Sequence, residues 1–206
     1  DTPWRFHHEF DPAVAQDACG RAAQCRDEIR FVRERETQLY RIADALADGT
    51  VPLRVTHNDT KLNNVLLDKT TGASLAVIDL DTVMPGSALF DFGDAVRYGA
   101  AMAEEDERDC QKVTLSLPHF EAYAKGFLAE AGDTLTETER SLLPYAAWLM
   151  TLECGMRFLT DYLNGDVYFK TDYPDHNLVR AKNQLALAAD MERRMMAMEQ
   201  AIKKDG

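Results

Sequence analysis

The sequence has no excess of basic residues and no basic stripe. Among its 206 residues, 23 are Lys or Arg and 35 are Asp or Glu, so the formal net charge is −12. Nucleic acids and anionic membranes attract proteins through clustered positive charge, and we therefore expect neither as a partner. An acidic surface suits a small molecule that is neutral or cationic.

Cysteine is scarce, and long apolar runs are missing. A zinc site is not expected, since no C-x-x-C pair occurs among Cys19, Cys25, Cys110 and Cys154. No run approaches the roughly twenty apolar residues that cross a bilayer, and no signal peptide is visible at the start. With 46% hydrophobic residues, the chain is predicted to fold around a sizeable core in the cytoplasm, where thiols stay reduced.

Apolar periodicity predicts a mainly helical chain. After an irregular segment at 1–11, apolar residues recur at steps of three and four from Asp11-Pro12 onward, which predicts one long amphipathic helix ending near Gly49. A capping box at Thr136–Glu139 predicts the start of another helix, which Pro144 should kink or delay. Further helices are predicted to begin near 89, in the acidic run 104–109, and at 117 and 176.

One short stretch has a different pattern and predicts a β-hairpin. Residues 64–67 and 74–80 have the character of strands, joined by a turn at 68–72 and preceded by an extended lead at 51–55. A hairpin brings the loop at its entrance close to the residues at its exit. The predicted fold class is therefore mainly α with a small β-hairpin.

Polar residues with a known chemical use lie at both ends of this hairpin. His57, Asp59 and Asn64 follow the pattern H-x-D-x-x-x-x-N, and Asp79 ends the second strand. This is the spacing of kinase catalytic loops, in which a carboxylate accepts the proton of the attacking hydroxyl. An amide oxygen and a second carboxylate can hold Mg²⁺ against nucleotide phosphates. The hairpin predicts that Asp59, Asn64 and Asp79 meet in one site.

The same residues carry a resemblance to a known family. With Val77-Ile78-Asp79 and the downstream Asp91, the motif resembles the C-terminal lobe of the aminoglycoside phosphotransferase and choline kinase-like superfamily. The strings HNDTKLNN at 57–64, IDLDTVMPG at 78–86 and RFLTDYLNGD at 157–166 are similar to its N-acetylhexosamine 1-kinase branch, sometimes named mucin desulfatases. The resemblance implies a protein kinase-like C-terminal lobe that uses ATP as co-substrate and Mg²⁺ as cofactor.

The resemblance also implies roles for single residues. Asp59 corresponds to the catalytic base, and Lys61 to a lysine near the transferred phosphate. Asn64 and Asp79 correspond to the ligands of the nucleotide-bound Mg²⁺. Asp81 is either a further metal ligand or a turn-capping aspartate. The string Asp91-Phe92-Gly93 spells the D-F-G metal motif of protein kinases, but we assign the metal to Asp79 and a bracing role to Asp91.

A second group of residues is expected to hold the acceptor. Glu153, Arg157 and Asp161 share one helix face at i, i+4 and i+8, which fits either a surface ladder of ion pairs or a pocket wall. Aromatic neighbours favour the pocket. By resemblance to the sugar 1-kinases, the substrate contacts are assigned to Arg157, Tyr168, Tyr98 and Asp161.

The family's N-terminal lobe has no counterpart in the sequence. That lobe carries a phosphate-covering loop and a strand lysine, and no strand-rich segment of this kind occurs here. We therefore expect residues 1–206 to be the C-terminal, catalytic and substrate-binding lobe, with an absent N-terminal lobe packing on it. Alone, the lobe should have little activity.

Three functions remain open. The first is an amino-sugar kinase lobe that makes N-acetylhexosamine 1-phosphate. The second is a kinase lobe for an aminoglycoside or a choline-like cation, which the acidic composition favours. The third is a non-catalytic binding module, which the missing lobe favours.

Overall fold

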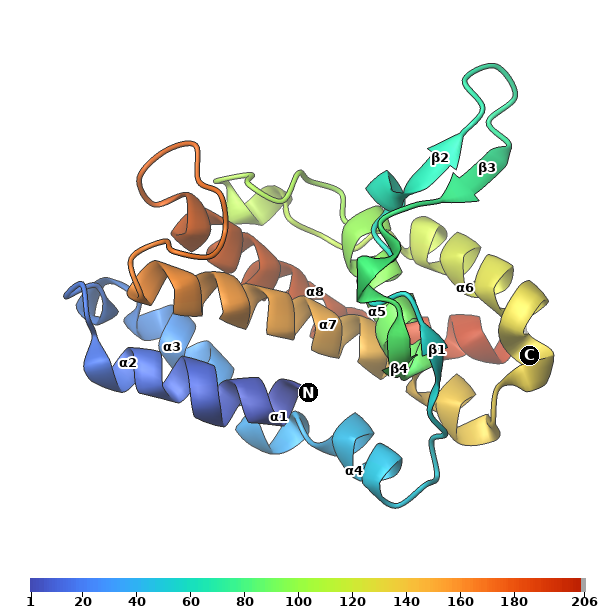
Figure 1. Ribbon diagram of the computed structural model, residues 1–206, viewed down its shortest axis with the longest axis horizontal. Coiled ribbons are helices and arrows are strands. Elements are labelled where there is room, and N and C mark those ends of the chain that lie inside the picture. The colour runs from blue at the N-terminus through green and yellow to red at the C-terminus, as the bar shows by residue number, and fades with distance from the viewer. Residues whose placement is uncertain (205–206) are drawn as a thin grey trace.

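Two long antiparallel helices form the centre of the fold. The computed structural model describes residues 1–204, and in it α7 (Glu137–Leu163) packs along α8 (His176–Lys204) (Figure 1). α5 (Ala88–Gly99) crosses α7, and α6 (Leu117–Ala131) packs on α8 and α5. No helix within the described residues combines the length and the apolar character needed to cross a membrane.

The start of α7 confirms the predicted capping box and ties a strand to the helical core. The Thr136 side chain accepts from Glu139 N at 3.1 Å, and the Glu139 carboxylate accepts from Thr136 N at 2.7 Å. The same carboxylate is fully buried and receives two N–H groups of Arg54 at 2.7 and 2.8 Å. Pro144 lies inside one continuous helix, so it does not delay the helix start. The Glu139 carboxylate therefore anchors the strand that leads into the predicted catalytic loop.

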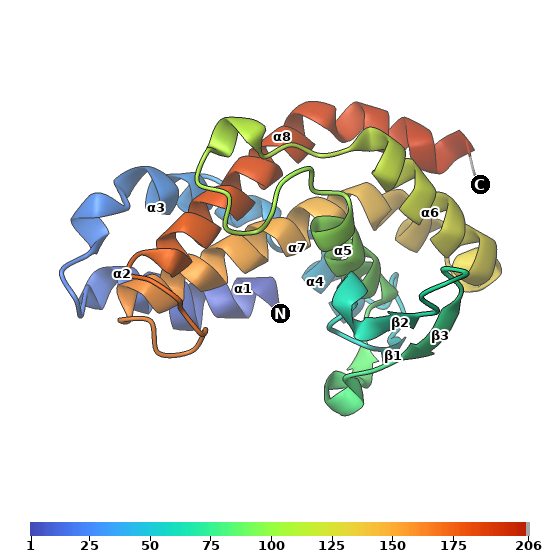
Figure 2. The same cartoon turned by 90° about the horizontal axis from the view of Figure 1, so that it is seen from above.

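Two small antiparallel sheets contain all the strands of the described residues. β1 (Arg54–Thr56) pairs with β4 (Met84–Gly86), and β2 (Val65–Leu67) pairs with β3 (Ser74–Val77). The β2–β3 hairpin confirms the prediction and projects from the helical body (Figures 1 and 2). Its second strand ends at Val77 rather than at 80, because Asp79 adopts a left-handed conformation with φ 63°.

The prediction of one long helix from 12 to about 48 is wrong. The segment forms short helices that are separated by turns. The first break follows from Asp17, which has φ 41° and whose carboxylate accepts from the N–H groups of Arg21 and Ala22 at 2.7 and 2.8 Å. A side chain that binds nearby backbone N–H groups competes with the helix for them. The helices in this part are α2 (Asp11–Gln16), α3 (Arg26–Arg33) and α4 (Arg41–Ala47).

Two further segments differ from their predicted conformations. Residues 1–11 are helical rather than irregular: α1 (Thr2–Arg5) continues into a π-helical turn at Phe6–Phe10, whose two phenylalanines are buried. The acidic run 104–109 forms no α-helix, because Asn183 of α8 donates to the carbonyl groups of Glu104 and Glu107 and holds the run as a loop; its last residue, Asp109, caps a short 3-10 turn at Cys110–Lys112. Both differences arise from packing against distant helices.

A single glycine permits the close contact between α5 and α7. A Cβ atom at Gly93 would lie 2.5 Å from the carbonyl oxygen of Ala146 and 2.7 Å from Met150. Any other residue would push the two helices apart, because backbone atoms cannot move out of the way. Since α5 also carries Asp91, this contact sets the distance between the catalytic loop and the core.

We predict that Gly93→Ala lowers the free energy of unfolding by about 1–3 kcal/mol, the usual penalty of overpacking. Chemical denaturation of the purified chain measures the change. Gly126→Ala in α6 is the matched control, because a Cβ at that position would meet no atom of another described segment within 4 Å. It should stabilise the protein by about 0.5–1 kcal/mol through helix propensity. Equal effects of the two substitutions would contradict the close packing.

Candidate active site

One aspartate at the start of α5 holds the loop that enters the hairpin. The carboxylate of Asp91 accepts from the backbone N–H groups of His57 and Asn58, both at 2.8 Å. Its carbonyl oxygen accepts from the hydroxyl of Thr60 at 2.5 Å. Both carboxylate oxygens are therefore occupied, as the predicted bracing role requires. In the described structure the Asp91 carboxylate thus binds the backbone of the loop, despite the D-F-G string that it begins.

A second set of hydrogen bonds ties the loop to the chain that leaves the hairpin. Asn58 has φ 64°, and its side chain donates to Thr82 O at 2.9 Å. The Thr82 hydroxyl donates to His57 O at 2.6 Å, and His57 Nε2 donates to Ile78 O at 2.9 Å. His57 Nδ1 accepts from Asp59 N at 3.2 Å, which fits a neutral imidazole protonated at Nε2. The loop and the segment around Asp79 thus form one unit.

Asp59 and Asn64 contact each other directly. The amide nitrogen of Asn64 donates to a carboxylate oxygen and to the backbone carbonyl of Asp59, both at 2.8 Å. Asn64 is only 5% exposed, so its orientation is fixed by the protein. Within the described part of the chain, its amide oxygen accepts no hydrogen bond and can serve a ligand. A fixed amide oxygen beside a carboxylate is the arrangement that the sequence motif predicts.

Lys61 neutralises the predicted base. Its ammonium donates to Asp59 Oδ2 at 2.7 Å. Burial by itself would raise the pKa of Asp59, but the hydrogen bonds from Lys61 and Asn64 hold that pKa below its usual range. The hydrogen bond to Asp59 raises the pKa of Lys61 against an opposing effect of burial, and the charges of Asp59, Asp79 and Asp94 raise it further. In this state both groups are charged and paired.

Asp79 lies at the exit of the hairpin, beside the loop. Ile78 N donates to Asn64 O at 2.9 Å, which continues the β2–β3 ladder and places the next residue at the site. The charge of Asp79 acts on Lys61, and Lys61 and Asn64 both donate to Asp59. Asp81 follows in an exposed 3-10 turn (Leu80–Thr82). Within the described residues its side chain makes no capping hydrogen bond, and its role as a metal ligand stays a prediction.

The donor set suits Mg²⁺ bound together with phosphates. Asn64 and Asp79 provide an amide oxygen and a carboxylate, and Mg²⁺ binds through oxygen ligands, often with only one or two from the protein. Among the residues with described positions, no group of three His, Cys, Asp or Glu side chains could hold a metal ion alone. A cation at this site would therefore need further ligands from substrate phosphates and water.

Three of the residues predicted to bind the acceptor substrate line one pocket, which lies beside the C-terminal half of α7. Its volume is about 530 Å³, and its walls include Arg157, Asp161 and Tyr168 together with Arg5 of α1. The Arg157 guanidinium lies 5.8 Å from the ring centre of Tyr168 and 5.4 Å from that of Phe169. Two residues of the predicted helix face, Arg157 and Asp161, thus line a pocket, whereas Glu153 pairs with Arg5 at 3.2 Å. Tyr168 is 73% exposed and stands at its rim.

Asp161 lines this pocket, and its carboxylate is bound by neighbouring groups of the protein. Its carboxylate accepts from the backbone N–H groups of Val167, Tyr168 and Phe169 at 2.8–3.0 Å and from the Asn177 amide at 2.8 Å. With four donors on a 5% exposed carboxylate, no acceptor position remains for a ligand. The carboxylate instead shapes the loop that carries Tyr168.

Tyr98 does not line the same pocket as the other residues predicted to bind the acceptor substrate. Its hydroxyl donates to Asn63 Oδ1 at 3.1 Å, beside the catalytic loop. It lines a separate pocket of about 450 Å³ whose wall carries three glutamates, Glu104, Glu105 and Glu107. The structure therefore does not bring Tyr98 into the pocket of Arg157 and Tyr168.

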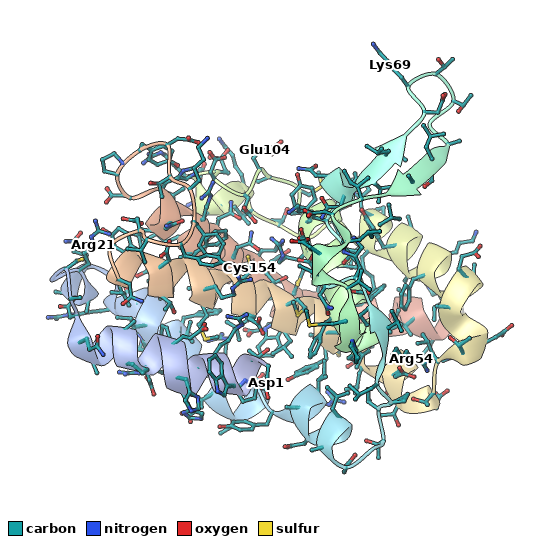
Figure 3. The ribbon with its side chains drawn as sticks, in the orientation of Figure 1. Asp1, Arg21, Arg54, Lys69, Glu104 and Cys154 are labelled. Carbon is teal, nitrogen blue, oxygen red and sulfur yellow. The ribbon has the colours of Figure 1, made fainter. Side chains whose placement is uncertain are left out.

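A network of ion pairs around the buried Arg97 was not predicted from the sequence. On α5, Arg97 donates to Asp94 at 3.0 Å and to Glu105 at 2.8 Å. Cys154 of α7, labelled in Figure 3, is half-buried and lies within the electrostatic influence of both Arg97 and Arg157. Burial raises the pKa of this thiol to about 12, so the thiol is neutral. The Asp94–Arg97 spacing of three in an apolar helix was the available signal.

Comparison with known families agrees with this geometry. A model of the phosphotransferase enzyme family, APH, matches residues 3–124. The match includes the catalytic loop, the hairpin and α5, and it confirms the resemblance at the level of the superfamily. Arg157 and Tyr168 lie outside the matched residues.

We predict that Lys61→Met raises the pKa of Asp59. The positive charge of Lys61 favours the carboxylate form, so its removal makes protonation easier and moves the titration to higher pH. A ¹³C-NMR titration of the aspartate side chains measures the change. Lys69→Met on the exposed hairpin turn is the control and should leave the Asp59 titration unchanged. An unmoved Asp59 titration in Lys61→Met would disprove the pairing.

Proposed function

Because the chain belongs to the phosphotransferase enzyme family, we propose that it carries the base and the acceptor-binding groups of a kinase that phosphorylates a sugar hydroxyl with ATP and Mg²⁺. One observation carries the proposal. Asp59 is held by Asn64 in a loop that Asp91 fixes to the core, with Lys61 beside it. A base, an amide and a lysine on one rigid loop are the parts that phosphoryl transfer uses.

Asp59 orients the acceptor and receives its proton. Its Oδ2 takes the hydroxyl hydrogen as the acceptor oxygen bonds to the γ-phosphorus and the bond to the ADP oxygen breaks. The depressed pKa of Asp59 keeps it ionised at neutral pH, as a base must be. Lys61 offsets the negative charge that develops on the phosphoryl oxygens.

Asn64 and Asp79 would hold Mg²⁺, with Asp81 as a further candidate ligand. The amide oxygen of Asn64 is fixed by the two hydrogen bonds that its nitrogen donates to Asp59. When bound, Mg²⁺ neutralises the phosphate charge of the nucleotide and aligns the transferred group. The protein's own part is to present two oxygen ligands at a fixed separation from the base.

The acceptor is proposed to be an amino sugar, with N-acetylhexosamine and its 1-phosphate as the specific pair. The Arg157 pocket has a volume of about 530 Å³, within the usual range for small-molecule sites. Arg157 donates to hydroxyl or carbonyl oxygens, and Tyr168 with Phe169 forms an aromatic wall. The similarity of residues 157–166 to the N-acetylhexosamine 1-kinases supports the same acceptor.

A cationic acceptor is the second candidate, and one observation favours it. The pocket beside Tyr98 is lined by Glu104, Glu105 and Glu107 and lies next to the catalytic loop through the Tyr98–Asn63 hydrogen bond. Glutamates would attract an aminoglycoside or a choline-like cation. Arg157 and Arg5 in the other pocket make that pocket unsuitable for a cation.

An N-terminal lobe is proposed to pack on the strand side of the chain. Residues 1–204 contain no strand-rich lobe and no glycine-rich phosphate loop. Large apolar side chains are exposed along the sheets and the turn after them, and Val55 alone is 82% exposed. Exposed apolar patches of this kind mark interaction surfaces. The residues concerned are Leu53, Val55, Leu66, Leu67, Leu75, Val77, Ile78, Leu80, Val83 and Met84.

We predict that Asp59→Asn lowers the turnover of the full-length natural protein by roughly 10²- to 10⁴-fold, the usual effect of a lost general base. A coupled assay of ADP release measures it. Asp68→Asn in the hairpin turn is the matched control, since it removes one carboxylate of the same hairpin and keeps its turn-capping oxygen. Near-normal turnover of Asp59→Asn would favour a different base or the non-catalytic module.

An acceptor panel distinguishes the two candidate substrates. We predict ADP release with N-acetylglucosamine or N-acetylgalactosamine and none with kanamycin or choline. Arg157→Met should then raise the KM for the sugar roughly tenfold with a smaller effect on kcat, because a lost ground-state contact weakens binding. Arg180→Met, which lies outside the pocket and contacts Phe158, is the control. Turnover of kanamycin or choline alone would support the cationic acceptor.

A further inference from the structure

One stripe of α5 contacts the catalytic loop. Asp91 binds the backbone of residues 57 and 58, and Tyr98 binds Asn63. Asp94 lies one turn after Asp91 and one turn before Tyr98, at spacings of three and four that share a helix face. It therefore faces the middle of the loop, where Lys61 lies.

The carboxylate of Asp94 is only half used. Its Oδ1 accepts from Arg97 Nε at 3.0 Å, and Arg97 is fixed in turn by Glu105 at 2.8 Å. Its Oδ2 is buried and accepts no hydrogen bond from any residue that the structure describes. A buried carboxylate oxygen without a donor is unfavourable, so it indicates a donor that arrives in another state.

Lys61 is the best candidate for the donor that binds Asp94 Oδ2 in that other state. Its ammonium has three N–H groups, and within residues 1–204 its ion pair is with Asp59. The charge of Asp94 already acts on it and raises its pKa. A ligand from solvent is a poorer candidate, because Asp94 Oδ2 has no accessible surface. Asp79 also acts on Lys61, but its carboxylate is exposed and assigned to the cation.

We propose that Asp94 is a positioning residue for Lys61: its buried Oδ2 receives the Lys61 ammonium when the acceptor hydroxyl takes the place of that ammonium on Asp59. The inference rests on the proposed role of Asp59 as base. While Lys61 occupies Asp59 Oδ2, this oxygen cannot receive a proton. A move of the ammonium to Asp94 frees this oxygen of Asp59 and at the same time supplies the missing donor to the buried carboxylate.

Kinetics of the full-length protein test the inference through a double-mutant cycle. Asp94→Asn should lower kcat roughly tenfold, the effect of one lost charged hydrogen bond, and leave both KM values nearly unchanged. In a Lys61→Met background the same substitution should change kcat by less than about twofold, because the two residues act together. Asp94→Glu, which keeps the charge, should recover part of the loss. A tenfold loss in both backgrounds would mean that Asp94 acts without Lys61 and would overturn the inference.

The ammonium resonance of Lys61 provides a test that needs no turnover and no folded Asp94 variant. In Asp59→Asn, whose Lys61 has lost its present partner, we expect a shifted ¹H–¹⁵N signal that is still protected from solvent exchange by Asp94. Lys69, on the exposed hairpin turn, supplies the unprotected reference signal. A Lys61 signal as exchangeable as that of Lys69 would overturn the inference.

The two proposals fail in distinguishable ways. If the unsubstituted protein shows no ADP release with any of the acceptors tested, the proposed function fails. The Lys61 resonance still decides whether Asp94 is the second partner of Lys61. If the protein is active but Lys61 in Asp59→Asn is unprotected, the positioning role of Asp94 fails alone.

Discussion

The carboxylate of Asp91 is the contact on which the site depends. It joins two backbone N–H groups of the catalytic loop to the first turn of α5, where the helix dipole also favours a negative charge. Two residues later, Gly93 lets α5 lie against the carbonyl of Ala146 in α7. The loop, which contains Asn58 in a left-handed conformation, is thereby held by α5 in a fixed position relative to α7. A base on a loop can be placed accurately only when the loop is bound in this way.

Although the chain is acidic overall, the basic side chains near the site are paired with carboxylates. The net charge is −12, yet the basic groups near the site each lie within reach of carboxylates: Lys61 pairs with Asp59, and Arg97 pairs with Asp94 and Glu105. Such pairing keeps the basic groups charged and oriented in a partly buried site. An oxygen that accepts from a lysine cannot at the same time accept a proton from a substrate, so proton transfer to Asp59 Oδ2 would need Lys61 to change its partner.

Local signals predicted much of the fold, and long-range packing decided the rest. The hairpin and the capping box at Thr136–Glu139 were predictable because their hydrogen bonds join residues close in sequence. The expected helix over 12–48 failed because periodicity reports a buried face but not a break: Asp17 ends α2 through its own side chain. In the site, Asp59 and Asn64 followed from a five-residue spacing, whereas the use of Asp161 by four donors could not be foreseen.

The sequence alone determined the resemblance to the family, the predicted catalytic loop and the hairpin that follows it, because motif spacing and turn chemistry act over a few residues. The tertiary structure decided which carboxylates are free. Asp91 and Asp161 are occupied by backbone N–H groups, Asp59 is paired with Lys61, and Asp94 keeps one buried oxygen to which no described residue donates. Whether an acidic group can bind a substrate depends on the donors around it, and several of these come from residues far away in the chain.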